Sequence, residues 1–222
     1  MQIVNFQPVR TVVHRRGCGK RVGFFPSMKV GRSIAFESLL ERDFIYLLEF
    51  DQNVITFCEQ PLTIRYYENN REKSYIPDFA VQRLESIEII EVKPKDKLHD
   101  EKIQKKLTAG HQYCNTAGYE YLIVTEDNIN PVILNNIKAL FGYSQIKVPA
   151  KIKMLVRELL DQSKVMTLNN LSVAIEARSD NACIAKSYIY NLLYCHELEV
   201  NLADPISLNS KVWLSRRRGT IV

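Results

Sequence analysis

Two short apolar runs that end on charged residues constrain this chain more than any other feature of its sequence. The first run is Tyr75–Phe79 (YIPDF) and the second is Ile89–Pro94 (IIEVKP). Apolar runs of this length, separated by polar turn residues, predict two β-strands joined as a hairpin. Neighbouring strands would bring the carboxylates of Asp78 and Glu91 and the ammonium group of Lys93 together at one edge of a sheet.

These three charged groups match the needs of phosphodiester hydrolysis. Asp78 follows Pro77, which cannot donate to a sheet ladder and therefore favours a strand start or a bulge that re-aims its neighbour. Glu91 and Lys93 are two residues apart, so they share one face of a strand, while Val92 points into the core. Carboxylate oxygens, with the carbonyl of Val92 as a third ligand, suit Mg²⁺, and a cation beside them can orient the attacking water. An ordinary solvated ion pair is the alternative interpretation of Glu91 and Lys93.

A predicted helix upstream adds a third carboxylate. Apolar residues recur at three-to-four spacing through residues 34–50, which indicates an amphipathic helix. Glu37 and Glu41 are four residues apart and share one face of it. We expect Glu41, which lies between Leu40 and Phe44, to complete the metal shell or to bind a second ion. Glu37 is the alternative, and a solvated helix face is the competing explanation of both.

The hydrophobic pattern divides the chain into three parts. Residues 1–32 are basic and lack a clear period, which predicts a basic N-terminal arm; a leader packed loosely on the domain is the alternative. Residues 33–146 predict an α/β domain, which carries the charged residues described above. Residues 147–222 predict three helices followed by two strands, which is the order of a winged-helix domain.

The same pattern predicts the individual elements. We expect helices at residues 34–50, 97–117, 131–140, 151–160, 168–176 and 182–195, and strands at residues 54–57, 62–67, 74–83, 87–92, 121–124, 197–200 and 211–214. The continuous apolar run at residues 121–124 predicts a strand that is buried on both faces.

Composition excludes some classes of protein. The chain has 222 residues, 46% of them hydrophobic, with a net charge of +5 and an isoelectric point near 8.9, which is compatible with nucleic-acid binding. Its five cysteines form no CxxC pair, so a zinc site is not expected. No apolar run reaches the ~18–20 residues of a membrane span, and the N-terminus lacks the apolar core of a signal peptide. We therefore expect a soluble intracellular protein.

Asp78, Glu91 and Lys93 form the predicted metal site, called the metal edge below. Basic residues outside it predict contacts with DNA phosphates. The residues concerned are Lys95, Lys102 and Lys106 near the helix that follows the site, and Lys211, Arg216, Arg217 and Arg218 towards the C-terminus. A solvated helix face, balanced by neighbouring acidic residues, is the alternative for the first group. The last predicted helix carries three tyrosines and, as its one cation, Lys186, which favours a core or a protein interface over base reading. We expect this domain to dock a partner.

The charged motifs resemble those of a known family. The segments Phe36–Glu41, Phe50–Val54, Glu59–Pro61, Tyr75–Phe79 and Glu91–Pro94 are similar to the motifs of TnsA-type transposon endonucleases, members of the PD-(D/E)XK nuclease superfamily. The resemblance covers nearly the whole chain. It implies a restriction-endonuclease-like mixed sheet flanked by helices, which is an α/β fold, followed by a C-terminal winged-helix domain.

The resemblance also implies a function. Glu41, Asp78, Glu91 and Lys93 match the family's catalytic positions, with Mg²⁺, for which Mn²⁺ substitutes, as the cofactor. Such a subunit cuts the 5′ ends of the transposon in double-stranded DNA. A DDE-type transposase partner cuts and joins the 3′ ends, and an AAA+ regulator ATPase contacts the pair during cut-and-paste transposition. We would expect such a protein in the bacterial cytoplasm. The alternatives are a stand-alone restriction or repair nuclease of the same superfamily and a non-catalytic DNA-binding adaptor.

Overall fold

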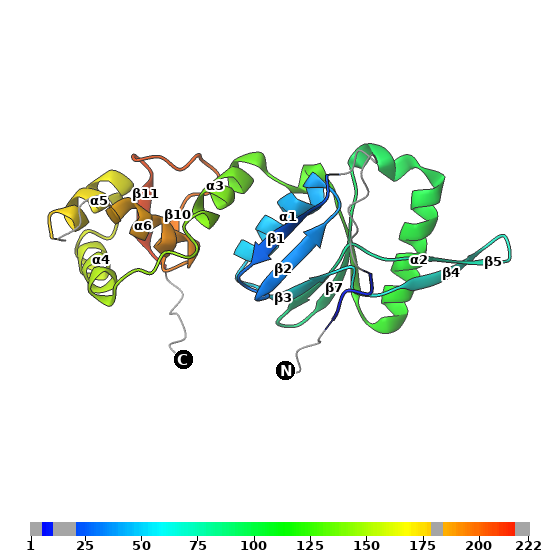
Figure 1. The fold of residues 1–222 in the computed structure, drawn as a ribbon. Coiled ribbons are helices and arrows are strands. Elements are labelled where there is room, and N and C mark those ends of the chain that lie inside the picture. The colour runs from blue at the N-terminus through cyan, green and yellow to red at the C-terminus, as the bar shows by residue number, and fades with distance from the viewer. Residues whose placement is uncertain (1–5, 11–20, 179–183, 216–222) are drawn as a thin grey trace. The chain divides into compact units, whose positions relative to one another are not determined.

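The computed structural model describes residues 6–10, 21–178 and 184–215, and these fall into two compact units, Met1–Asn130 and Pro131–Val222 (Figure 1). The basic cluster at residues 14–21 of the predicted arm lies almost wholly outside the described residues, and Arg216, Arg217 and Arg218 lie outside them too. No helix in the described part of the chain is long and apolar enough to cross a membrane.

A four-stranded mixed sheet forms the centre of the first unit. Its strands are β3 (Val54–Glu59), β6 (Phe79–Arg83), β7 (Ile87–Val92) and β8 (Glu120–Val124), in the order β3-β6-β7-β8. The pairs β3–β6 and β6–β7 are antiparallel, whereas β8 runs parallel to β7. The predicted hairpin across residues 84–86 is therefore present, and a mixed sheet with helices fits the predicted restriction-endonuclease-like fold.

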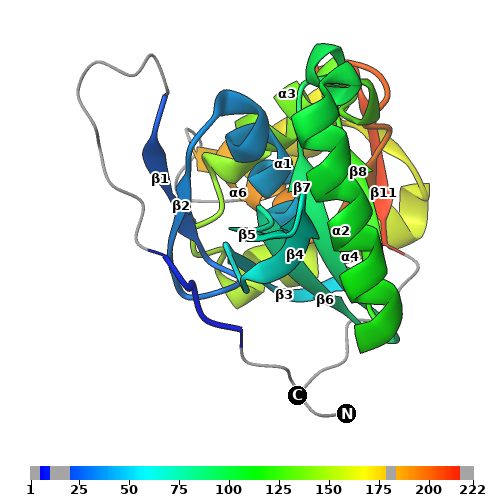
Figure 2. The ribbon, with the colours of Figure 1, turned by 90° about the vertical axis from the view of Figure 1, so that its right-hand side faces the viewer.

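Two helices cover opposite faces of this sheet, as Figures 1 and 2 show from perpendicular directions. Helix α1 (Leu39–Phe50) lies on one face and α2 (Glu101–Ala117) on the other. Helix α2 begins at Asp100, whose side chain accepts from the Lys102 and Ile103 amides, and it ends at Gly118 in the left-handed conformation (φ 73°). The predicted helix at residues 97–117 thus starts later than expected, after the short 3-10 helix η1 (Lys95–His99).

The segment before α1 corrects two predictions. Strands β1 (Gly23–Ser27) and β2 (Arg32–Phe36) pair as an antiparallel hairpin, so the predicted arm, residues 1–32, includes part of the folded domain, and residues 34–36 are strand rather than helix. Ser38 stops the helical pattern because it is extended (φ −146°) and its side chain caps α1.

The turn of this hairpin is tied to the other end of α1. The buried Glu49 accepts from the Ser27 hydroxyl (2.6 Å) and from the Met28 and Lys29 amides (2.8 and 2.9 Å). Lys29 Nζ donates to the Leu48 carbonyl at 2.8 Å, which satisfies a backbone group at the C-terminus of the helix. These contacts give the basic residue Lys29 a structural role.

A second hairpin projects beyond α2 (Figure 1). It consists of β4 (Ile64–Glu68) and β5 (Arg71–Tyr75), joined by Asn69 and Asn70 with φ of 51° and 57°. Two successive positive φ angles are typical of the tight turns that match strand twist. The strand predicted at residues 74–83 is therefore two strands, which belong to different sheets and are separated by residues 76–78.

Strand β8 corrects a third prediction. It is the last strand in the order β3-β6-β7-β8, and Leu122 and Ile123 are 40% and 38% exposed. The apolar run predicted a strand covered on both faces, but an edge strand has a neighbour on one side only. The short 3-10 helix η2 (Glu126–Asn128) follows it.

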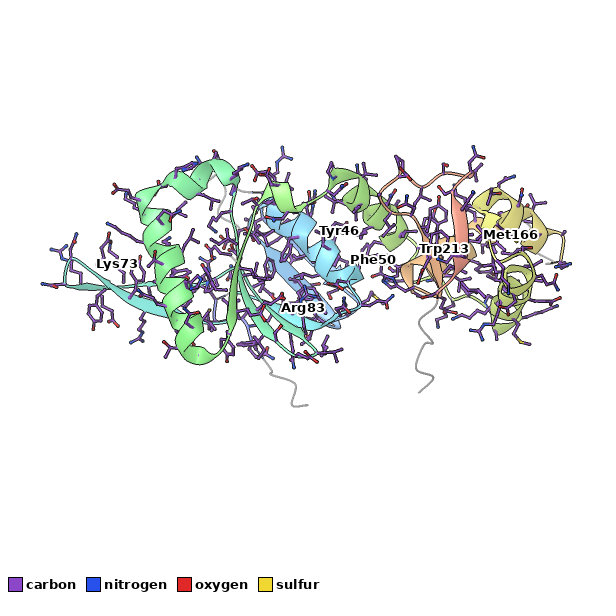
Figure 3. All side chains as sticks on the ribbon, turned by 180° about the vertical axis from the view of Figure 1, so that it is seen from behind. Tyr46, Phe50, Lys73, Arg83, Met166 and Trp213 are labelled. Atoms are coloured by element: carbon purple, nitrogen blue, oxygen red, sulfur yellow. The ribbon has the colours of Figure 1, made fainter. Side chains whose placement is uncertain are left out.

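The second unit contains four helices and a small sheet among its described residues. The helices are α3 (Pro131–Phe141), α4 (Ala150–Ser163), α5 (Leu168–Glu176) and α6 (Ala185–Tyr194), and the strands are β9 (Met166–Thr167), β10 (Leu198–Val200) and β11 (Lys211–Leu214) in the order β10-β11-β9. Leu160, Leu171, Ile175 and Ile189 are fully buried in its core. Figure 3 labels Met166 and Trp213 on the sheet.

The division between the units falls earlier than the predicted boundary at residues 146–147. Helix α3 belongs to the second unit, where it packs against α6. Its buried Asn136 donates to the carbonyls of Leu202 and Asp204 (2.9 and 2.8 Å) and accepts from the Ile206 amide (3.0 Å). The side chain thus fixes α3 to the loop between β10 and β11, a contact that helical periodicity could not indicate.

Candidate metal centre

The register of β6 and β7 brings the predicted carboxylates together. Phe79 pairs with Ile90, so Asp78, immediately before β6, lies beside Glu91 near the end of β7. The Asp78 amide donates to the Ile90 carbonyl at 3.1 Å. In return the Val92 amide donates to Asp78 Oδ2 at 2.7 Å, which fixes the orientation of the carboxylate. The antiparallel pair thus brings both acids together, as predicted, at the same end of these two strands.

Lys93 neutralises part of the negative charge of Asp78 and Glu91. Its Nζ lies 2.7 Å from Glu91 Oε1 and 3.0 Å from Asp78 Oδ2, and it also donates to the Val92 carbonyl at 3.1 Å. Burial alone would lower the pKa of Lys93, but the charges of Asp78 and Glu91 outweigh burial and raise it. Lys93 is therefore a fixed cation between the two carboxylates.

Glu91 has one carboxylate oxygen without a partner. Its side chain is buried, and Oε2 has no hydrogen-bond partner in the described part of the chain. Burial, followed by the charge of Asp78, raises the pKa of Glu91 to about 7. Buried carboxylate oxygens are costly unless something satisfies them, and a hard divalent cation is such a group. Among the described residues Glu88 Oε2 also has no hydrogen-bond partner, but Glu88 pairs with Arg83 (2.6 Å) towards the other end of β7, so what distinguishes Glu91 is its place beside Asp78 and Lys93.

Glu41 lies close to this pair but is turned towards its own helix. Ser38 Oγ donates to Glu41 Oε1 at 2.9 Å, and the Glu37 amide donates to Oε2 at 2.7 Å. Burial, followed by the charge of Asp78, raises the pKa of Glu41 to about 7, which places it within electrostatic range of Asp78. Accordingly, no group of three His, Cys, Asp or Glu side chains in the described residues is arranged to hold a metal. The oxygen set at the sheet edge is Asp78, Glu91 and the Val92 carbonyl.

Glu37, the predicted alternative to Glu41, belongs to a separate network that sequence reasoning missed. Arg10 forms an ion pair with Glu37 and donates to Gln60 Oε1 at 3.1 Å, while the Val9 amide donates to the Gln60 carbonyl at 2.9 Å. The Gln60 amide in turn donates to the Asp78 carbonyl at 2.8 Å. The N-terminal segment is thus linked to the backbone of the metal edge through Gln60.

Two features around Gln60 carry sequence signals that the site prediction did not use. Gln60 has a positive φ of 47°, which is unusual for a residue other than glycine and marks a position held by its surroundings. The preceding buried residue, Glu59, receives two bonds of 2.7 Å from the guanidinium of Arg32. A glutamate in an otherwise apolar strand is a signal for such a pair.

Helix α2 approaches the other side of the site very closely. The hydroxyls of Tyr75 and Tyr121 lie 3.3 Å apart, and a Cβ on Gly110 would overlap the Tyr75 hydroxyl and lie 2.5 Å from Tyr121 Cζ. Lys106 lies one turn before Gly110, and its charge acts to lower the pKa of Glu91, against burial. The sequence signal for this contact is a glycine inside a strongly helical pattern.

The structure brings one of the predicted DNA-contact lysines towards the site. This residue is Lys106, which is half-buried. Lys95 pairs with Asp127 at 2.5 Å, and Lys102 is exposed in the first turn of α2. Lys211 is exposed on β11 in the second unit. Of the residues predicted around the metal, Asp78, Glu91, Val92 and Lys93 are in contact with one another.

The central sheet and α2 coincide with a recognised family domain. Residues 51–126 match the model of the TnsA-like endonuclease N-terminal family. This part of the chain is similar to TnsA-like endonuclease domains. The TnsA-like match includes Asp78, Glu91 and Lys93 and ends before the second unit begins, while α1 with Glu41 lies before it. No curated protein matches the chain. A TnsA-like domain implies endonuclease activity on DNA in association with a transposase.

Proposed function

We propose that the protein is the metal-dependent DNA endonuclease subunit of a heteromeric transposase, and that it cuts the 5′ ends of the transposon during cut-and-paste transposition. The observation that carries this proposal is the buried, unpartnered Glu91 Oε2 beside Asp78 and Lys93. The TnsA-like match over the same residues supports a nuclease in a transposase.

Asp78, Glu91 and the Val92 carbonyl are the residues that would hold Mg²⁺ or Mn²⁺. Such an ion supplies a water of lowered pKa and neutralises charge on the phosphate. The Val92 amide and Lys93 both contact Oδ2 of Asp78, which leaves Oδ1 as a ligand. Lys93, permanently charged, orients the attacking water and stabilises the negative charge that develops on the phosphate.

Glu41 has a different role in this proposal. Because its pKa is about 7, its carboxyl group can hold a proton near neutral pH, and a rotation away from Ser38 and the Glu37 amide would bring it into the metal shell. The Glu41 carboxylate would then lose its hydrogen bonds at the start of the helix and contact the ion. Glu41 would then be a fourth ligand, beside Asp78, Glu91 and the Val92 carbonyl.

The second unit supports the heteromeric part of the proposal. Helices α4, α5 and α6 with the β10-β11-β9 sheet follow the element order of a winged helix. Two tyrosines of α6 pack internally, Tyr190 against the Tyr143 ring (centroids 4.9 Å apart) and Tyr194 against Phe141 (6.0 Å), so these two belong to the core and the docking assignment rests on the scarcity of cations on α6. We assign this winged-helix-like unit to docking of the DDE-type transposase or the AAA+ ATPase, with Lys211 as a phosphate contact.

The test compares wild-type and Asp78→Ala full-length protein. Calorimetric titration of Mn²⁺ should show binding to the wild type and a loss of binding in the variant. Cleavage of transposon-end DNA with both partner proteins and Mg²⁺ should be abolished in the variant. Full cleavage by a folded Asp78→Ala protein would refute the proposed function. Efficient cleavage by the wild type alone would instead favour a stand-alone nuclease, and no cleavage under any condition would favour an adaptor.

A further inference from the structure

A groove lies between α2 and the β4–β5 hairpin, and the residues that line it are distinct from Asp78, Glu91 and Lys93. Its volume is about 830 Å³, and both elements supply its walls. The residues that matter for its chemistry are Arg65, Tyr67 and Glu68 on the hairpin, and Lys105, Gln112 and Tyr113 on the helix. Figure 2 views the unit with α2 and the hairpin towards the reader.

The lining of this groove is polar, cationic and aromatic. The Arg65 side chain is 75% exposed and pairs with Glu72 at 3.6 Å, and Tyr67 and Tyr113 are 78% and 38% exposed. Guanidinium, amide and hydroxyl groups of this kind, the tyrosine hydroxyls included, make the contacts that proteins form with phosphate and sugar. A groove for a protein partner would instead be expected to present a buried apolar centre.

Glu68 holds two lysines at the groove. Lys105 Nζ lies 2.6 Å from Glu68 Oε1, and Lys73, labelled on the hairpin in Figure 3, pairs with Glu68 Oε2. The two lysines come from different elements, so this one carboxylate connects the hairpin to α2. Hydrogen bonds from Lys105 and Lys73 lower the pKa of Glu68 to about 2. An anion is therefore already stabilised at this position, and a phosphate oxygen has the same acceptor chemistry.

The base of the groove packs against Tyr75, the last residue of the strand that leads to Asp78. At its base, Ala109 of α2 packs in one buried cluster with Ile64 and Tyr75. The charges of Glu91 and Asp78 both contribute to raising the pKa of Tyr75, after burial, so this tyrosine lies within electrostatic range of both carboxylates. Along the chain, β5 ends at Tyr75 and the next strand begins directly after Asp78.

We propose that this groove binds the sugar-phosphate backbone of the DNA duplex next to the phosphate that is cleaved. The inference rests on the proposed function and adds the path of the substrate. Arg65 and Lys105 contact phosphates, while Tyr67 and Tyr113 lie against the sugars. Glu68 keeps the lysines in place and moderates the positive charge, so it limits affinity.

The experiment measures equilibrium binding of a fluorescently labelled linear DNA duplex of mixed sequence to the full-length protein in EDTA, over a series of salt concentrations. The double variant Arg65→Ala/Lys105→Ala should weaken binding by roughly 10-fold or more and reduce the slope of log K against log salt by about 2, because two phosphate contacts are lost. Glu68→Gln should tighten binding, since it releases both lysines.

Lys153→Ala is the matched control. Lys153 is exposed to a similar degree as Lys105 and is also paired with a glutamate, Glu197, but it lies on α4 in the other unit. Binding by this variant should equal that of the wild type. The side chains of Arg65 and Lys105 are exposed, so an unchanged thermal midpoint will show that the double variant is folded. Tyr67→Ala provides a second variant, which should weaken DNA binding without changing the salt slope.

Wild-type affinity and slope in the double variant, together with an unchanged Glu68→Gln protein, would overturn the groove proposal and leave the proposed nuclease intact. Loss of binding to a partner protein with unchanged DNA affinity would also overturn it and identify a protein-docking surface. The nuclease proposal fails if Asp78→Ala protein still cleaves DNA. That result does not alter the measurement of DNA binding by the groove variants.

Discussion

The ammonium group of Lys93 lies 2.7 Å from Glu91 Oε1, while Oε2 of the same carboxylate is buried without a hydrogen-bond partner among the described residues. One oxygen is therefore neutralised by the protein, and the other is left for a ligand. Such an arrangement favours metal binding at the expense of the stability of the metal-free fold.

Glu91→Gln should stabilise the metal-free protein at high pH. The pKa of Glu91 is about 7 in the folded state against an ordinary value of 4.5, so between these pH values the folded state binds more protons than the unfolded state. The contribution of Glu91 to the free energy of unfolding is fully present below pH 4.5 and is lost as the pH rises to 7. At pH 8 the variant should gain on the order of 1–3 kcal/mol in free energy of unfolding, and at pH 4.5 almost nothing. Thermal melts in EDTA measure both values, and a less stable variant at pH 8 would contradict the argument.

Lys93→Ala and Glu91→Ala should separate metal binding from catalysis. Lys93 acts on water and phosphate, so Lys93→Ala should keep metal affinity roughly unchanged but lose cleavage, whereas Glu91→Ala should lose both. Without metal, Lys93→Ala also leaves two buried carboxylates uncompensated, which should cost about 3 kcal/mol of stability. Calorimetric titration and thermal melts make the comparison, with Lys73→Ala as an exposed control. An equal loss of metal affinity in both active-site variants would refute the division of roles.

Gly110→Ala should destabilise the first unit. The new Cβ would overlap the Tyr75 hydroxyl and the Tyr121 ring, so the helix would have to move away from the sheet, at a cost of roughly 1–3 kcal/mol. Gly142→Ala is the control, because its Cβ would meet only the Ala139 carbonyl at 3.4 Å. Urea denaturation of both variants tests this, and Tyr75→Phe in the Gly110→Ala background should recover part of the loss. Equal stability of the two alanine variants would show that the close approach is not required.

Asp78→Ala should change the product of transposition rather than abolish the reaction. If this subunit makes the 5′ cut, the partner still cuts and joins the 3′ ends, and the donor flanks remain attached. Insertions should then shift from simple insertions to cointegrates. Sequencing of the insertion junctions distinguishes the two, with Lys153→Ala as a control that keeps the wild-type product. Unchanged simple insertions would exclude the proposed 5′ cut.

Local patterns were sufficient to predict the central contacts of the site. Asp78 and Glu91 lie at the ends of two strands joined by a short turn, and the two-residue period of a strand puts Lys93 beside Glu91. These contacts therefore involve residues that are close in sequence. Glu41 was harder, because the helical pattern predicts which face of the helix it lies on but not its rotamer. In the structure the Ser38 hydroxyl donates to one of its oxygens and the Glu37 amide to the other.

The features that sequence reasoning missed depend on residues far apart in the chain. Arg10 reaches Gln60, and Tyr75 reaches Tyr121, through contacts that no local period encodes. The strand Gly23–Ser27 is short and lies beside a basic stretch, so composition obscured it. The apolar run of β8 predicted burial, but the order of strands in the sheet decides which strand is at the edge.

The β6–β7 hairpin has a consequence for how the site is assembled. Contacts between strands that are adjacent in sequence close small loops and form early, whereas contacts across long separations wait for the rest of the chain. We expect Asp78, Glu91 and Lys93 to come together with the hairpin itself, and the Gln60 and Glu41 sides of the site to be added only when β3 and α1 dock. The cluster of Asp78, Glu91 and Lys93 would then exist in a folding intermediate before the residues around it are in place, and the order of protection in pulsed hydrogen exchange would reveal this sequence of events.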